Sequence, residues 1–186
     1  MKRIASGLVA GFFVLAASGC STTAPAYPVS IENVELLKMA GDFKARVGTF
    51  GAAQVAANAN PISLRGTAMR SPYGNSYGDY VAEAIKQELM LAQKLAPAAG
   101  VEISGEMLKN DIDAAIGTGR GNAQVRFVVK QGGQVRFDKV KSTEQQWESS
   151  FAGMVALPRA MQEYGLMIQK LLASLYSDPD FVKAVK

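Results

Sequence analysis

The fold is decided by the stretch Gln124-Val125-Arg126-Phe127-Val128-Val129-Lys130-Gln131-Gly132-Gly133-Gln134-Val135-Arg136-Phe137. In its first half, apolar residues alternate with Arg126 and Lys130, which predicts a strand with one buried face. The two glycines supply a tight turn, and the second half returns with the same alternation toward Trp147. The stretch therefore predicts a β-hairpin.

A further strand is expected directly before this hairpin. Val101–Leu108 alternates in the same way, and the pattern continues after a bulge through Ile112–Ile116. Gly117–Asn122 contains three glycines, so we expect a connection there. The strand and the hairpin together predict a meander of three antiparallel strands.

Spacing and capping residues predict the other elements. In order, they are a helix at Ile31–Ala40 capped by Ser30, strands at Phe43–Phe50 and Ile62–Met69, a helix at Tyr77–Leu95 capped by Asn75 or Ser76, the meander, a helix at Arg159–Tyr176 with Pro158 in its first turn, and a last turn at Phe181–Val185. Two long helices on one face of a five-stranded, largely antiparallel sheet form a two-layer α+β sandwich. We expect one such domain, at residues 31–186.

The first residues have the form of a secretory signal. Met1-Lys2-Arg3 precedes the apolar run Ile4–Ala17. A bilayer core requires about 20 apolar residues, so this run is too short to span it. We therefore expect residues 1–19 to be a signal peptide that is cleaved between Gly19 and Cys20.

The string Leu15-Ala16-Ala17-Ser18-Gly19-Cys20 resembles the bacterial lipobox. The resemblance implies diacylglycerol on the Cys20 thiol and an N-acyl chain, such as palmitate, on its amino group. In such lipoproteins Asp after the Cys resembles an inner-membrane retention signal, so Ser21 implies the outer membrane of a Gram-negative bacterium, with the domain on the periplasmic face. The alternative is an ordinary secretory signal with a chance Cys. Residues 20–30 are expected to be the lipidated Cys and a flexible tether.

Composition narrows the chemistry further. The formal net charge is +4, and Lys2 and Arg3 supply two of these charges, so a mature chain carries only +2 and requires no nucleic-acid partner. The chain contains no His and one Cys. This excludes Ser-His-Asp and Cys-His nucleophilic sites and zinc sites that use either residue type. We expect no enzyme activity, no catalytic residues, no metal, and no cofactor beyond the acyl chains on Cys20.

Two motifs suggest ligand chemistry, but a plainer interpretation is available for each. Gly117-Thr118-Gly119-Arg120-Gly121 could cradle phosphate, yet no helix opens after it to hold an anion, so a hairpin connection is favoured. Asp111 and Asp113, with Glu106 nearby, could collect a divalent cation. Further oxygen ligands are not spaced for such a site, so solvated surface is favoured.

Aromatic and basic residues give a candidate interaction surface. Aromatic side chains could dock a partner or a glycan, although core packing would also explain them. The meander is locally basic through Arg120, Arg126, Lys130, Arg136, Lys139 and Lys141. That patch could meet anionic lipid head groups, or it could be the wet face of a half-exposed sheet. The candidate surface comprises Tyr73, Tyr77, Tyr80, Arg126, Arg136 and Trp147. The methionines near the last long helix are expected in the core, namely Met154, Met161 and Met167.

Several motifs in the second half of the chain resemble the YajG-type family of bacterial lipoproteins. They are Ile103-Ser104-Gly105, Phe127-Val128-Val129, Trp147-Glu148-Ser149-Ser150-Phe151 followed by Ala156-Leu157-Pro158, and Tyr176-Ser177-Asp178-Pro179-Asp180-Phe181. The wider fold resembles the amino-terminal domain of TolB and the periplasmic part of curli-secretion lipoproteins. The resemblance implies a fold and a location, and it implies no catalytic residues.

These observations lead to two functional hypotheses. The first is a non-catalytic outer-membrane lipoprotein whose periplasmic domain binds a partner protein or itself, as an accessory to envelope assembly. The second is a carrier of lipid or lipopolysaccharide, which requires a cavity of at least a few hundred cubic ångströms.

Overall fold

The computed structural model describes residues 21–186. The predicted signal peptide at residues 1–19, its cleavage between Gly19 and Cys20, and the acylation of Cys20 lie outside the described residues and stay predictions. Among residues 21–186, no helix combines the length and the hydropathy that are needed to cross a bilayer.

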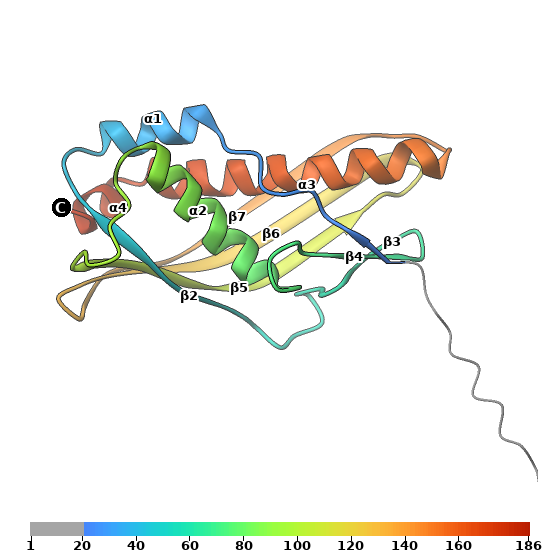
Figure 1. The fold of residues 1–186 in the computed structure, drawn as a ribbon. Helices are drawn as coiled ribbons and strands as arrows, with labels where there is room; N and C mark the ends of the chain where they lie inside the picture. Colours follow the sequence, from blue (N-terminus) through green and yellow to red (C-terminus); the bar gives the residue numbers. More distant parts are fainter. Residues whose placement is uncertain (1–20) are drawn as a thin grey trace, which may run out of the picture.

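Residues 21–186 fold into two sheets and four helices (Figure 1). The elements are β1 (Ser21–Thr23), α1 (Ile31–Met39), β2 (Ala45–Ala52), β3 (Ile62–Leu64), β4 (Thr67–Arg70), α2 (Tyr77–Leu91), β5 (Val101–Asp113), β6 (Gly117–Gln131), β7 (Gln134–Ser149), α3 (Gly153–Tyr176) and α4 (Pro179–Ala184). The main sheet has the order β2-β5-β6-β7, and the small sheet has the order β1-β4-β3. The α+β class is confirmed, whereas the single five-stranded sheet is wrong.

The predicted meander forms most of the main sheet. Strands β5, β6 and β7 pair antiparallel, and β2 joins the edge of β5 in parallel. The expected bulge appears as a register shift between Met107 and Lys109. Gly132 and Gly133 turn the β6–β7 hairpin with φ values of 57° and 83°, which glycine adopts without strain.

The connection predicted at Gly117–Asn122 is wrong, because these residues form the first part of β6. Trp147 on the neighbouring strand β7 lies so close that a Cβ at Gly119 would overlap its indole ring. A Cβ at Gly121 would similarly press on the sulfur of Met167 in α3. These glycines therefore mark close packing within a strand.

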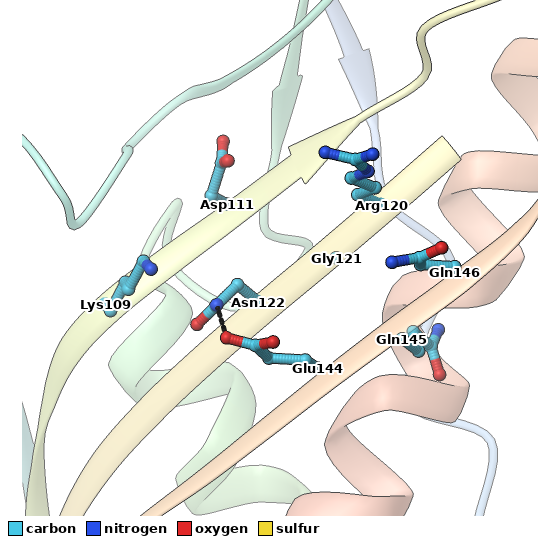
Figure 2. A pocket seen from close by; sticks show the side chains of 8 residues that line it. All are labelled: Lys109, Asp111, Arg120, Gly121, Asn122, Glu144, Gln145 and Gln146. Atoms are coloured by element: carbon cyan, nitrogen blue, oxygen red, sulfur yellow. Dashed lines mark hydrogen bonds between the residues drawn. The ribbon is translucent and has the colours of Figure 1, made fainter. Parts of the chain in front are cut away.

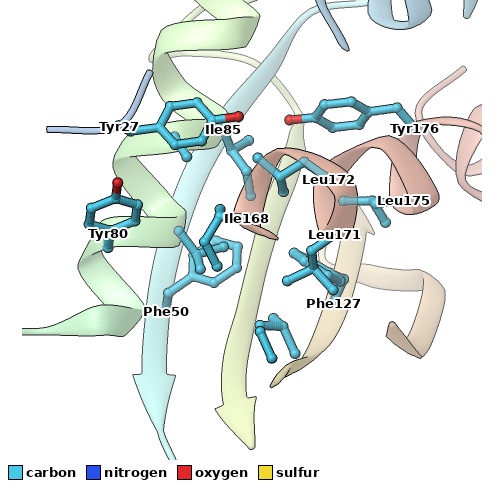
Figure 3. Close-up of a cluster of buried hydrophobic side chains, with 14 of the residues drawn as sticks. Tyr27, Phe50, Tyr80, Ile85, Phe127, Ile168, Leu171, Leu172, Leu175 and Tyr176 are labelled. Carbon is cyan, nitrogen blue, oxygen red and sulfur yellow. The ribbon is translucent and has the colours of Figure 1, made fainter. Parts of the chain in front are cut away.

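The long helices α2 and α3 lie on the same face of the main sheet, as predicted (Figure 1). Between the layers, Phe50 of β2 and Phe127 of β6 meet edge to face, with ring centroids 6.0 Å apart. Ile168 and Leu171 of α3 belong to the same buried cluster (Figure 3). Burial of apolar surface contributes about 25 cal/mol per Å², so packing of this kind holds the two layers together.

Helix α3 begins before the predicted first turn at Pro158 and Arg159. It starts at Gly153, so Pro158 lies inside the helix. Pro158 has no N–H to donate to the carbonyl of Met154, four residues earlier in the helix. Met154 is exposed, so this carbonyl is not buried without a partner. Met154 was expected in the core, and that expectation is wrong, whereas Met167 is buried as expected.

The small sheet takes up the segment that was predicted as one strand, Ile62–Met69. Arg65 and Gly66 have φ values of 47° and 85°, the positive values that a tight hairpin turn needs, and they divide the segment into β3 and β4. Strand β4 then pairs in parallel with β1, with Met69 opposite Thr22. This pairing draws the segment away from the main sheet, so a fifth strand does not form there.

Residues 21–30 are packed on the domain, so the predicted flexible tether is wrong for this segment. After β1, the backbone N–H of Ala24 donates to a β4 carbonyl over 2.8 Å. Ala24 and Tyr27 are buried, and the ring of Pro28 lies against Gly165 of α3. The folded domain therefore includes this segment.

Candidate functional site

The candidate interaction surface does not form one exposed patch. Tyr77 and Tyr80 of α2 are buried against Tyr164 of α3, with ring centroids 5.1 Å apart in both pairs. Trp147 is buried against β6, and Tyr73 is half-buried. The core-packing interpretation therefore holds for Tyr77, Tyr80 and Trp147, because these rings fill the space between the helices and the sheet.

The basic residues of the meander are divided between its two faces. Arg126 donates to both carboxylate oxygens of Asp138 over 2.7 and 2.5 Å on the open face of the main sheet. Lys139 and Lys141 lie on the helical side of β7 and bind Asp178 over 3.1 and 2.7 Å. These pairings neutralise much of the predicted basic patch.

The lysines of β7 have a structural role. Burial alone would raise the pKa of Asp178, but hydrogen bonds from Lys141, the Asp180 backbone and Lys139 outweigh it and hold that pKa below its usual range. Asp178 also caps α4. The ion pairs thus fasten the junction of α3 and α4 to β7, and Arg136 stays exposed beside the β6–β7 hairpin.

The face of the main sheet away from the helices holds a shallow polar depression (Figure 2). Asn122 of β6 donates to Glu144 of β7 over 2.7 Å. The lining comes from three adjacent strands and comprises Lys109, Asp111, Arg120, Gly121, Asn122, Glu144, Gln145 and Gln146. Because charges of both signs alternate here, the surface offers hydrogen bonds to a polar partner and has no preference for an anion.

The acidic residues considered as cation ligands lie on this open face. Asp111 and Asp113 are exposed on β5, opposite Asn122 and Arg120 of β6. Glu106 lies on the other side of the β5 bulge. Within residues 21–186, no three carboxylate, His or Cys groups gather as a metal site. The absence of a metal stays a prediction.

The carrier hypothesis requires an enclosed apolar cavity. Depressions on the surface of residues 21–186 have volumes of about 190 to 450 Å³ and are open to solvent. Most of them are lined mainly by polar or charged side chains. Large apolar side chains fill the space between helices and sheet. This geometry does not favour a carrier.

A buried carboxylate lies where the N-terminal segment meets the helices. Glu88 of α2 is fully buried. Its Oε1 accepts hydrogen bonds from the Tyr27 hydroxyl over 2.6 Å, the Asn33 amide over 3.0 Å and, more weakly, the Ser30 backbone N–H over 3.4 Å. Asn33 also donates to the carbonyl of Gln169 in α3 over 3.0 Å. One carboxylate therefore joins the N-terminal segment to three helices.

The electrostatics of this cluster follow from burial. Burial raises the pKa of Glu88 above its ordinary value of 4.5, and the hydrogen bonds from Tyr27 and Asn33 offset only part of that rise. Burial, with the nearby Glu88, also raises the pKa of Tyr27. Sequence motifs do not point to Glu88, although a signal exists: it lies three residues after Ile85 on the apolar stripe of α2.

Stability is expected to depend on pH through Glu88. Its pKa is higher in the folded than in the unfolded chain, so its contribution is fully present below pH 4.5 and is lost as pH rises through the raised value. Glu88→Gln keeps the acceptor oxygen and removes the titration. In urea unfolding between about pH 4.5 and pH 8, we expect the native chain to lose stability relative to Glu88→Gln. Parallel profiles for the two chains would contradict this.

Arg65 joins the small sheet to one end of the main sheet. Its Nε donates to the carbonyl of Ala114 over 2.6 Å, and its two Nη atoms donate to the carbonyls of Phe151 and Ser150 over 2.9 and 2.7 Å. Large exposed apolar side chains lie within four residues of these carbonyls in the sequence, and we call them the apolar tip: Ile116, Phe151, Met154 and Val155. Arg65 therefore fixes the backbone from which this tip projects.

Removing the Arg65 side chain should loosen the junction. Hydrogen bonds to charged groups contribute about 1.5–3 kcal/mol each when buried, and less where water competes. We therefore expect Arg65→Ala to lower the free energy of unfolding, measured by urea titration, by about 1–3 kcal/mol. The matched control is Arg70→Ala, because the exposed Arg70 side chain makes no hydrogen bond within residues 21–186. Equal effects of the two substitutions would show that the Arg65 hydrogen bonds do not stabilise the fold.

Comparison with known proteins shows the fold and no more. No family model matches the sequence, and no curated protein sequence matches it. Among solved structures, protein XCC0632 from Xanthomonas campestris, of family DUF330, is similar with a TM-score of 0.57 and 12% identity, covering 88% of this chain and 96% of that chain.

Two further structures are more distant. A candidate lipoprotein from Caulobacter crescentus gives a TM-score of 0.45 with 10% identity, covering 82% of this chain and 93% of that chain. The PelC dodecamer from Paraburkholderia phytofirmans gives 0.40 with 14% identity, covering 89% and 95%. Scores this low carry no argument about function, and the resemblance to YajG-type and TolB-like proteins is not confirmed.

Proposed function

We propose that this chain is an outer-membrane lipoprotein, held by acyl chains on Cys20, whose periplasmic domain binds a protein partner or a second copy of itself. It acts as an accessory to envelope assembly and has no catalytic role. The lipobox resemblance supports the anchor, and Ser21 after the Cys supports the outer membrane. The domain offers a surface suited to binding another polypeptide.

The observation that carries the binding role is the free edge of β7. This strand has 16 residues and lies at the end of the main sheet. Within residues 21–186, its outer edge pairs with no other strand, so its N–H and C=O groups can accept a strand from a partner. Charged side chains such as Asp138 and Glu144 line the strand, which limits unselective pairing and favours a complementary partner.

Acylation is tested on the full-length chain in cells. Labelled palmitate should appear on the polypeptide, and globomycin should cause the unprocessed precursor to accumulate. A Cys20→Ser variant is the control, since it removes the thiol and leaves the rest of the signal unchanged. Unchanged processing in globomycin, together with no label, would refute the lipoprotein assignment.

Partner binding is tested by photo-crosslinking in living cells. A photoreactive residue at Ser142 lies on β7, and the matched control at Gln162 lies exposed on α3. We expect covalent adducts, identified by mass spectrometry, at Ser142 and not at Gln162. Absence of adducts at both positions, or equal adducts at both, would contradict a binding role for β7.

A further inference from the structure

The apolar tip lies at the end of the domain where the described chain begins. Ser21 pairs with Ala68 next to the start of β4, and β4 follows directly from the turn at Arg65 and Gly66. Arg65 contacts the carbonyl of Phe151 in the tip. In Figure 1, the start of β1 and the start of α3 accordingly lie toward the same end of the molecule, away from the C-terminus.

No residues separate the predicted anchor, Cys20, from the start of β1 at Ser21. Cys20 directly precedes Ser21 in the sequence, and adjacent Cα atoms are about 3.8 Å apart. Because Ser21 is already paired in β1, acyl chains on Cys20 would hold the small sheet close to the bilayer surface. The apolar tip then lies at the same surface.

The apolar tip consists of large apolar side chains, whose transfer out of water is favourable. Ile116, Phe151, Met154 and Val155 expose 64%, 81%, 85% and 57% of their area. They come from two separate places, the β5–β6 connection and the segment that enters α3, and the Arg65 hydrogen bonds hold those places together. Large apolar side chains that gather on an exposed surface mark an interaction site.

We propose that the apolar tip inserts into the lipid surface beside the acyl chains, as a second attachment that fixes the orientation of the domain. This inference rests on the proposed lipoprotein function. Stable membrane attachment commonly combines an acyl group with a second apolar or charged contact. Strand β6 runs from the tip to the hairpin over 15 residues, or about 50 Å at 3.3 Å per residue, so the hairpin end of β7 would point away from the membrane.

The test uses the lipidated full chain, reconstituted in vesicles of phosphatidylethanolamine and phosphatidylglycerol. An environment-sensitive fluorophore is attached at Met154→Cys, where acylation of Cys20 leaves the new thiol as the single free one. The matched control is Met39→Cys, because Met39 is also a well-exposed methionine, at 72%, and α1 ends toward the opposite end of the domain (Figure 1). Quencher groups are placed on the lipid acyl chains.

We expect the emission at position 154 to shift to shorter wavelength and to be quenched by the labelled lipids, with neither change at position 39. Emission at position 154 that matches position 39, in a chain whose mass shows the acyl groups, would overturn the tip contact and leave the lipoprotein assignment intact. A blue shift without quenching by lipid would indicate a protein contact and would also overturn it. A mass without acyl groups would overturn the lipoprotein assignment, and the tip contact with it.

Discussion

Glu88→Leu is expected to lower the free energy of unfolding by about 3–6 kcal/mol, because buried donors left without an acceptor cost about 1–3 kcal/mol each. The buried donors are the Tyr27 hydroxyl and the Asn33 amide, and the half-buried Ser30 backbone N–H adds a weaker contact. Leucine fills a similar volume, so the loss should come from hydrogen bonding rather than from a cavity. Urea unfolding measures the total, and hydrogen exchange of residues 24–30 shows where the structure opens.

The matched control is Glu88→Gln, which keeps an oxygen acceptor at the same place. We expect this variant to retain most of the stability near neutral pH and to keep residues 24–30 protected from exchange. If Glu88→Leu were as stable as Glu88→Gln, hydrogen bonds to an oxygen acceptor at position 88 would not be what holds the segment.

Under the proposed lipoprotein function, the N-terminal segment would link this cluster to the membrane. With the Tyr27–Glu88 hydrogen bond in place, the chain is fastened to the domain from β1 to α1. The proposed lipid on Cys20 would then determine which end of the domain faces the bilayer. A released segment would act as the flexible tether that the sequence predicts. Under this proposal, the orientation of the domain would depend on the Tyr27–Glu88 hydrogen bond.

Regular alternation made the meander predictable from the sequence. Val125, Phe127 and Val129 mark one buried face, and the glycine pair at Gly132 and Gly133 marks the turn, because both signals are local. The prediction failed where a distant partner decides the local structure. Gly119 lies in strand β6, where Trp147 of β7 occupies the space that a side chain would need, so this glycine serves packing and does not mark a turn.

The same limit explains the errors at the N-terminus and in the candidate site. Small polar residues and two prolines suggest a tether, but Tyr27 binds Glu88, which is 61 positions away in the sequence. Tyr77 and Tyr80 suggest a docking surface by residue type, whereas α3 buries both. Contacts between residues that lie far apart in the sequence produce no periodic pattern, so the sequence alone could not show them.

Gly78→Ala is expected to lower the free energy of unfolding by about 3 kcal/mol, at the upper end of the usual cost of overpacking. Gly78 lies in the first turn of α2, where a Cβ would be 2.5 Å from the carbonyl oxygen of Phe50 and 2.9 Å from that of Gly51. Both atoms belong to the backbone of β2, which cannot move without disturbing its pairing with β5. The first turn of α2 should therefore separate from the main sheet, and urea unfolding measures the loss.

The matched control is Gly153→Ala, which places the same methyl group in the first turn of α3. No atom lies within 4 Å of a Cβ at Gly153, and alanine favours a helix over glycine by up to about 1 kcal/mol. The same substitution is thus expected to destabilise at one helix start and to be neutral or stabilising at the other. If both variants were neutral, α2 would not pack against β2 as closely as the backbone distances indicate. Packing of α2 on β2 would then not be what places Glu88 beneath the N-terminal segment.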